Sequence, residues 1–379
     1  MVQSLKRGDL RRIFAVALLL ALVTGCTPAS ESEVNSAQPP AESESASPTV
    51  TSEPKPLDLE NQWFSRCASY EPLSGQAWHL VYNEVIADIC SNTTIEPNVL
   101  EVIYSPGVNQ DRLKDFIETA EFSFNYWRPK TLDTAPVKLI LLNEQEREWF
   151  ESTLAPLVKD PGVLEWFGPD AQGVGRCWSI GPDAACGAKY PVWETTTGTL
   201  VYVTLLGTRR VPDDEFNLDA AHNAVHWYQD SHGWDHWDYG FLEGQATVHE
   251  IAFHILLTGS DKKREDGAWT VFANDPKPFK ATTVEETIKH HNECRPDSNQ
   301  CHHHFYFGGA MQQEKIILDF GYPKYLQWLT EVESVESREA YEATFRNVFG
   351  VELPKWRDES WAPYLLESFL YYRENRWGE

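Results

Sequence analysis

Two histidines stand four residues apart in the stretch AAHNAVHWYQ, residues 220–229. Residues with this spacing lie on one face of an α-helix, so His222 and His226 can present two imidazoles to one metal ion. An open zinc site needs three protein ligands and leaves its fourth position for water. The best third ligand is Glu243, which follows in the stretch GFLEGQA. A turn between two antiparallel helices would bring this carboxylate opposite the two imidazoles.

Two further acidic residues are placed to act on such a site. Asp219 lies three residues before His222, where it can orient the imidazole as a hydrogen-bond acceptor or serve as a solvated acid near the helix start. Glu250 lies seven residues after Glu243, on the same helix face. It is either a partner of a metal ligand or a replacement general base.

Other histidines compete for the role of ligand. His249 and His254 are five residues apart, which places them about 140° apart around a helix, so we expect core or surface histidines there. The stretch HHNECRPDSNQCHHHFYF, residues 290–307, holds five histidines. It is a second metal-binding loop, a wall of the pocket or an exposed polar loop, and Tyr306 is its best candidate to face a substrate.

The motif resembles that of the gluzincin metallopeptidases, in which His-Glu-x-x-His is followed at a similar distance by a Glu ligand. It is most similar to their peptidase-MA-like branch, because Gln229 follows the motif and the third ligand stands in Glu243-Gly244-Gln245-Ala246. The likeness extends to residues 305–329 and 345–356, and it covers roughly residues 98–370. It implies an α+β, zincin-like fold and one Zn²⁺ per chain, bound by the three residues named above.

The chain departs from this family at Asn223, where a gluzincin has the Glu that acts as general base. An amide cannot take up a proton at neutral pH, so the resemblance implies a catalytically impaired relative that binds a peptide or protein ligand. It also implies that Tyr306 or a nearby histidine stabilises a transition state. Two alternatives stay open: an active metallohydrolase with another base, and a metal-free structural or ligand-binding lipoprotein.

A mixed sheet followed by helices must position these residues. Strands are expected over residues 98–106, 136–143 and 198–206. The last of these is an edge strand that pairs with a substrate, as in gluzincins, or an ordinary central strand. Helices are expected over residues 109–127, from Asp213 to before Gly233, over 239–259, and after residue 282 with breaks at Gly321, Gly350 and Pro354. Residues 61–95 are expected to be irregular or short-helical. The predicted domain, residues 57–379, thus has a mixed α/β part to residue 212 and a helical part from residue 213.

The N-terminus indicates export and anchoring. Basic residues precede a short apolar run, and Val23-Thr24-Gly25-Cys26 is typical of a bacterial lipobox. Residues 1–25 would be a lipoprotein signal peptide, with Cys26 acylated to hold the protein outside the cytoplasm on the cell membrane. Arg11-Arg12 leaves both Sec and twin-arginine export open. Residues 26–56, rich in Ser, Glu and Pro, predict a disordered tether.

Charge and cysteine content restrict the partners and the compartment. Residues 1–25 hold four of the 32 basic and one of the 57 acidic residues, so the rest of the chain has a formal charge of −28. Such a surface repels nucleic acid. Six cysteines remain after Cys26, and in an exported chain they predict disulfides. Sequence alone allows 15 pairings, and we favour the local pairs Cys67–Cys90, Cys177–Cys186 and Cys294–Cys301.

Overall fold

The structure is a computed structural model. It describes residues 61–108, 110–142, 146–159, 189–192, 196, 200–205, 213–233, 239–273, 277–294, 301, 303–332, 335 and 337–376. All of these belong to one compact unit, Asp58–Glu379. The predicted signal peptide, Cys26, the tether, Cys177 and Cys186 lie outside the described residues.

One sheet lies at the base of this unit. Its described strands are β1 (Leu100–Tyr104), β2 (Val137–Leu142), β3 (Lys189–Val192) and β4 (Val201–Leu205). They are arranged in the order β1-β2-β4-β3; β1, β2 and β4 are parallel, and β3 runs antiparallel to β4. The strand predicted over residues 198–206 is therefore central. Its Val, Tyr and Val side chains are buried, as expected for a strand covered on both faces.

Other described helices precede β1 or lie between the strands along the chain. They are α2 (Gln62–Ser69), α3 (Ala77–Asn92), α4 (Gln110–Trp127), the short 3₁₀ turn η1 (Arg128–Lys130) and α5 (Arg147–Leu154). Of these, α4 packs against β1. The apolar face predicted for α4 is buried, including Phe116, Ile117 and Phe124. The 16-residue helix α3 is longer than the sequence suggested. Its buried face is rich in aromatic and β-branched residues, whose helix propensity is low, so tertiary packing decides its conformation.

From Asp213 onward the described residues are predominantly helical. The helices are α8 (Asp213–Ser231), α9 (Tyr239–Thr258), α10 (Lys262–Ala273), α11 (Val284–Glu293), the π-helical turn η3 (His304–Gly308), α12 (Gly309–Phe320), α13 (Tyr322–Val332), α14 (Arg338–Phe349), α15 (Leu353–Trp356), the π-helical turn η4 (Arg357–Trp361) and α16 (Ala362–Arg376). Gly321 and Gly350 end α12 and α14 with positive φ, as predicted. Pro354 lies in the first turn of α15, where it begins a helix. The chain is therefore α+β, with its helices concentrated after the sheet.

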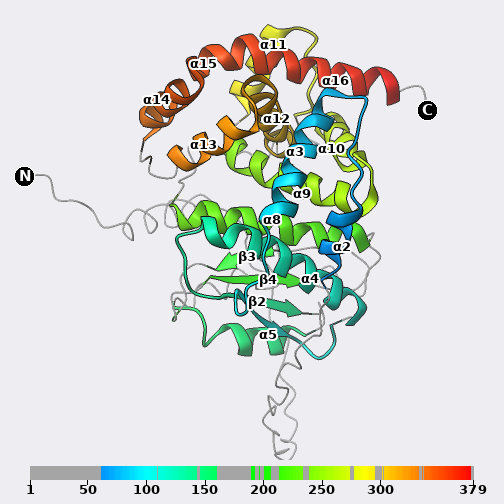
Figure 1. Cartoon of the computed structure of the whole chain (residues 1–379), viewed down its shortest axis with the longest axis vertical. Coiled ribbons are helices and arrows are strands. Elements are labelled where there is room, and N and C mark those ends of the chain that lie inside the picture. Colours follow the sequence, from blue (N-terminus) through cyan, green and yellow to red (C-terminus); the bar gives the residue numbers. More distant parts are fainter. Residues whose placement is uncertain are drawn as a thin grey trace, which may run out of the picture. The chain divides into compact units, whose positions relative to one another are not determined.

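Helices α8 and α9 form the centre of the unit. In Figure 1 the sheet lies on one side of α8, and α11 to α16 lie beyond α9 on the other side. The two helices pack along each other, and α9 also packs against α12. Any site formed between α8 and α9 is therefore held between the sheet and the C-terminal helices.

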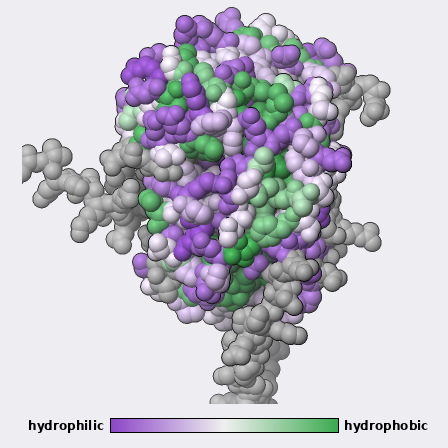
Figure 2. Space-filling view, in the orientation of Figure 1, coloured by the Kyte–Doolittle hydropathy of each residue, from purple (hydrophilic) through white to green (hydrophobic). Residues whose placement is uncertain are grey.

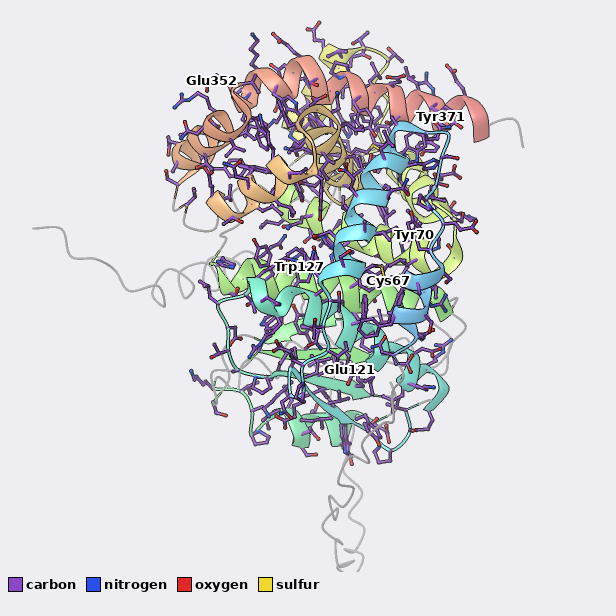
Figure 3. All side chains as sticks on the ribbon, viewed as in Figure 1. Cys67, Tyr70, Glu121, Trp127, Glu352 and Tyr371 are labelled. Carbon is purple, nitrogen blue, oxygen red and sulfur yellow. A yellow bond between two sulfur atoms is a disulfide. The ribbon has the colours of Figure 1, made fainter. Side chains whose placement is uncertain are left out.

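Two predicted disulfides are confirmed, Cys67–Cys90 and Cys294–Cys301. The first joins α2 to α3, where Cys67 is labelled in Figure 3. Disulfides are typical of chains that fold in an oxidising compartment. Hydrophilic and hydrophobic residues are interspersed over the face shown in Figure 2. Among the described helices, none combines the length and the apolar character that crossing a bilayer requires.

Candidate metal centre

The three predicted metal ligands converge. His222 and His226, both on α8, have their Nε2 atoms 3.0 Å apart. Oε2 of Glu243, on α9, lies 3.3 Å from Nε2 of His222 and 3.4 Å from Nε2 of His226. The three donor atoms thus form a nearly equilateral triangle.

This triangle has the size that a metal ion requires. A four-coordinate ion with bonds of about 2.0–2.1 Å holds any two ligands about 3.3 Å apart. Oε2 of Glu243 is buried and, within the described part of the chain, makes no hydrogen bond of regular geometry. Burying a carboxylate oxygen without a hydrogen bond costs folding free energy, and a cation in contact with the oxygen would offset this cost. His222, His226 and Glu243 can therefore hold a metal ion.

Packing of α8 against α9 fixes the positions of these ligands. The hydroxyl of Tyr202 on β4 donates to the backbone carbonyl of Asn223 over 2.9 Å, which attaches α8 to the sheet at the motif itself. His222 and Glu243 are buried, whereas the side chain of His226 is 23% exposed. The site is therefore anchored on the His222 side and reaches solvent on the His226 side.

Gln229 fixes the orientation of His226. Its Oε1 atom lies 2.8 Å from Nδ1 of His226, and its Nε2 donates to the carbonyl of Leu242 and to Oε1 of Gln245. Because the amide nitrogen is used by these two acceptors, the amide oxygen faces the imidazole and accepts from Nδ1–H. The lone pair of His226 is thereby left on Nε2, the atom that faces Glu243.

Glu250 performs the same role for His222, but with a charged group. Its Oε2 lies 3.2 Å from Nδ1 of His222, and its Oε1 lies 3.1 Å from Nζ of Lys263 on α10. Both carboxylate oxygens face these partners behind the imidazole, a position suited to orienting the ligand and poorly suited to a general base. The sequence offered both Asp219 and Glu250 as partners of a metal ligand. Glu250 is the one seen at Nδ1 of His222, while Nε2, the other ring nitrogen, faces Glu243 and His226.

The electrostatics of this cluster favour a cation. Burial lowers the pKa of the His222 imidazole, but its contacts with Glu243 and Glu250 outweigh burial and raise the pKa to about 9. Burial raises the pKa of Glu243, and its contacts with the two imidazoles outweigh this and hold the pKa far below the usual range. The protein therefore stabilises a positive charge beside an ionised Glu243, and a proton or a metal ion can supply that charge.

Tyr306 reaches the site from the C-terminal half. Its ring is 5.6 Å from the ring of His222, and the two planes are within 11° of parallel. Tyr306 belongs to η3, which packs against α9, α10 and α12. The sequence-based proposal that Tyr306 faces the site is thus consistent with where the structure places it.

A close approach of backbones holds η3 and α12 against α9. A Cβ atom on Gly309 would lie 2.0 Å from the carbonyl oxygen of Gly240, and one on Gly244 would lie 2.2 Å from the carbonyl carbon of Gly309. Only glycine permits this separation. Gly244 directly follows the ligand Glu243, so the same contact fixes both the third ligand and the turn that bears Tyr306.

Asn223 is 8% exposed and lies between the two histidines on α8. Its amide has no useful acid–base chemistry near neutral pH, so this position cannot supply a general base.

Other described histidines have contacts of their own. His249 packs against the rings of Tyr126 and Trp127, and the ring of His254 contacts the backbone carbonyl of Ser260. Both are buried, so of the two expected places, core or surface, they lie in the core. His290 and His304 are also buried, so the exposed polar loop, one of the three alternatives for residues 290–307, is wrong for these two residues.

The roles of Gln229 and Lys263 were not predicted from the sequence. Gln229 stands one turn after His226, and this spacing is a usable signal for a residue that orients a ligand. Lys263 comes from a different helix, and no local spacing connects it to Glu250.

Comparison of the chain with known proteins found no matching family model, curated protein or solved structure.

Proposed function

We propose that this chain is a gluzincin-like zinc protein, in which His222, His226 and Glu243 bind one Zn²⁺. The observation that carries the proposal is the triangle of donor atoms with edges of 3.0, 3.3 and 3.4 Å. Two imidazoles and one carboxylate are a ligand set of open zinc sites, and they leave a coordination position for water or substrate. Gln229 and Glu250 support the proposal, because ligand histidines in metal sites usually donate their second N–H to such acceptors.

We further propose that hydrolysis at this site is impaired. Zinc supplies Lewis acidity, which polarises a carbonyl group and acidifies water. Proton transfer still requires a base, and general acid–base catalysis contributes about 10²–10⁴-fold to rates. Asn223 cannot serve, and Glu250 is engaged by His222 and Lys263. The site would then bind peptide or protein ligands and cleave them slowly, with Tyr306 beside the reacting group.

We also propose that this domain is held on the outer side of a bacterial cell membrane as a lipoprotein, because the sequence around Cys26 is typical of a lipobox. The two disulfides support an oxidising compartment. The tether before the domain would let it reach ligands near the membrane surface.

Metal analysis of the purified chain tests the site. We expect about one zinc per chain, and loss of zinc in His222→Ala. His254→Ala is the matched control, because His254 is also buried and its Nδ1 lies 3.1 Å from the carbonyl oxygen of Ser260, outside the triangle of donor atoms. If zinc is absent from the wild type, or is retained by His222→Ala, the proposed site is refuted.

A peptide-cleavage assay tests the impairment separately. Asn223→Glu places a carboxylate where the base is expected, so cleavage should rise by about 10²–10⁴-fold over the wild type. His222→Ala in the same background should abolish the gain. Rapid zinc-dependent cleavage by the wild type would refute the impairment while leaving the zinc site intact.

A further inference from the structure

A second cluster of metal-ligating side chains lies at the disulfide between α11 and η3. His290 and Cys294 are one helical turn apart, and Nε2 of His290 lies 3.4 Å from Sγ of Cys294. Cys301 is bonded to Cys294 and comes three residues before η3. One donor atom from each of the three residues lies within 4.8 Å of the others.

This cluster is buried and surrounded by more imidazole. Cys294, Cys301 and His290 are exposed by 6%, 1% and 8%. The ring of His304 is 5.0 Å from that of His290, and Nε2 of His304 is 3.2 Å from Nδ1 of His291. Such a concentration of donor side chains in a buried region is more than a structural disulfide requires.

Each partner is held in place by contacts other than the disulfide. Helix α11 packs against α16, and the ring of His290 packs against Phe279. The turn η3, which follows Cys301, packs against α9, α10 and α12. Opening the S–S bond would therefore leave both sulfur atoms close to His290.

We propose that reduction of Cys294–Cys301 converts this cluster into a second zinc site with His290, Cys294 and Cys301 as ligands. A sulfur atom in a disulfide is a poor metal ligand, whereas two thiolates and an imidazole are a preferred set for Zn²⁺. A dithiol reductant would supply two electrons and two protons and become a disulfide itself. Binding of Zn²⁺ then releases the two thiol protons. The oxidised chain would hold one zinc ion and the reduced chain two.

Cobalt(II) tests this proposal independently of the first site, because only a site containing sulfur gives a thiolate-to-cobalt charge-transfer band. The full-length His222→Ala variant is reduced with a dithiol, freed of reductant without oxygen and titrated with Co²⁺. We expect the band to saturate near one Co²⁺ per chain, and to be absent before reduction. It should disappear in Cys294→Ser/Cys301→Ser, and His290→Ala should bind Co²⁺ at least about tenfold more weakly.

The other cysteine pairs provide the controls. Cys67→Ser/Cys90→Ser and Cys177→Ser/Cys186→Ser, each in the same background, should keep the band. Survival of the band in Cys294→Ser/Cys301→Ser would overturn the proposal, and so would no band in a reduced chain that circular dichroism shows to be folded. If reduction unfolds the chain and Co²⁺ does not restore the fold, the proposal also fails, because a metal bound only by the folded form must stabilise it.

Discussion

Glu250 faces the back of the His222 ring, with its Oε2 3.2 Å from Nδ1, while Glu243 faces the front at Nε2 over 3.3 Å. One imidazole is thus enclosed between two carboxylates from the same helix, α9. Glu250 in turn contacts Lys263, so a chain of three charged or ionisable groups leads from α10 to the candidate metal centre. This arrangement orients the ring and increases its basicity as a ligand.

Replacing Glu250 by Gln should weaken zinc binding. The amide is similar in size but lacks the negative charge that increases the basicity of His222, so we expect a loss of about 10–100-fold in affinity. Lys263→Met should have a smaller effect, because it removes only the second partner of Glu250. Competition with a chromogenic chelator measures both affinities. Unchanged affinity in Glu250→Gln would show that this carboxylate does not act on the metal ligand.

Gln229→Leu should weaken zinc binding and also destabilise the fold. The change removes the acceptor for Nδ1 of His226 and leaves the carbonyl of Leu242 without this donor inside the protein. We expect a loss of about 1–3 kcal/mol in the free energy of unfolding, measured by urea denaturation of the zinc-free protein. Gln327→Leu is the control, because Gln327 donates only along an exposed helix face. Equal stability of the two variants would contradict the role of Gln229.

Local spacing predicted the parts of this site that lie on one helix. The i,i+4 pair of His222 and His226 and the amphipathic face of α4 follow directly from the helical repeat. The central position of β4 was one of two alternatives. An apolar strand has the same sequence pattern at the edge and in the centre of a sheet, so the pattern alone could not decide between them.

Contacts between elements that are distant in the sequence could not be predicted from local spacing. Lys263 meets Glu250 only because α10 folds against α9, and the Gly244–Gly309 approach joins residues 65 positions apart. Spacing along the chain offered both Asp219 and Glu250 as partners of a metal ligand. It could not show that Glu250, on the facing helix, lies at Nδ1 of His222.

Gly309→Ala should damage both the fold and the site. The new Cβ would lie 2.0 Å from the carbonyl oxygen of Gly240, so η3 and α12 must move away from α9. We expect a loss of at least about 1–3 kcal/mol in the free energy of unfolding, together with weaker zinc binding. Gly308→Ala is the matched control, because the nearest atom to its Cβ would be Nδ1 of the His304 side chain, at 3.3 Å, and not a backbone atom. Similar stability losses in both variants would contradict the importance of the close approach.

His249 should make the protein sensitive to acid. Burial, together with the charge of Lys130, lowers the pKa of His249 to about 3, so the imidazole is neutral in the folded chain, whereas in the unfolded chain it titrates near its ordinary value of 6.5. The unfolded chain therefore binds more protons between these two values. The contribution of neutral His249 to the free energy of unfolding is fully present above pH 6.5. It is lost as the pH falls towards 3, at up to about 1.4 kcal/mol per pH unit.

His249→Leu removes this titration, and it also removes a buried Nδ1 that has no hydrogen bond in the described structure. We expect its free energy of unfolding at pH 7 to stay within about 1.5 kcal/mol of the wild-type value. Between pH 6.5 and 4.5, the free energy of unfolding of His249→Leu should fall less steeply with decreasing pH than that of the wild type. Urea denaturation across this range measures both slopes. Parallel curves would mean that His249 is protonated in the folded chain, and burial between Tyr126 and Trp127 would then not keep it neutral.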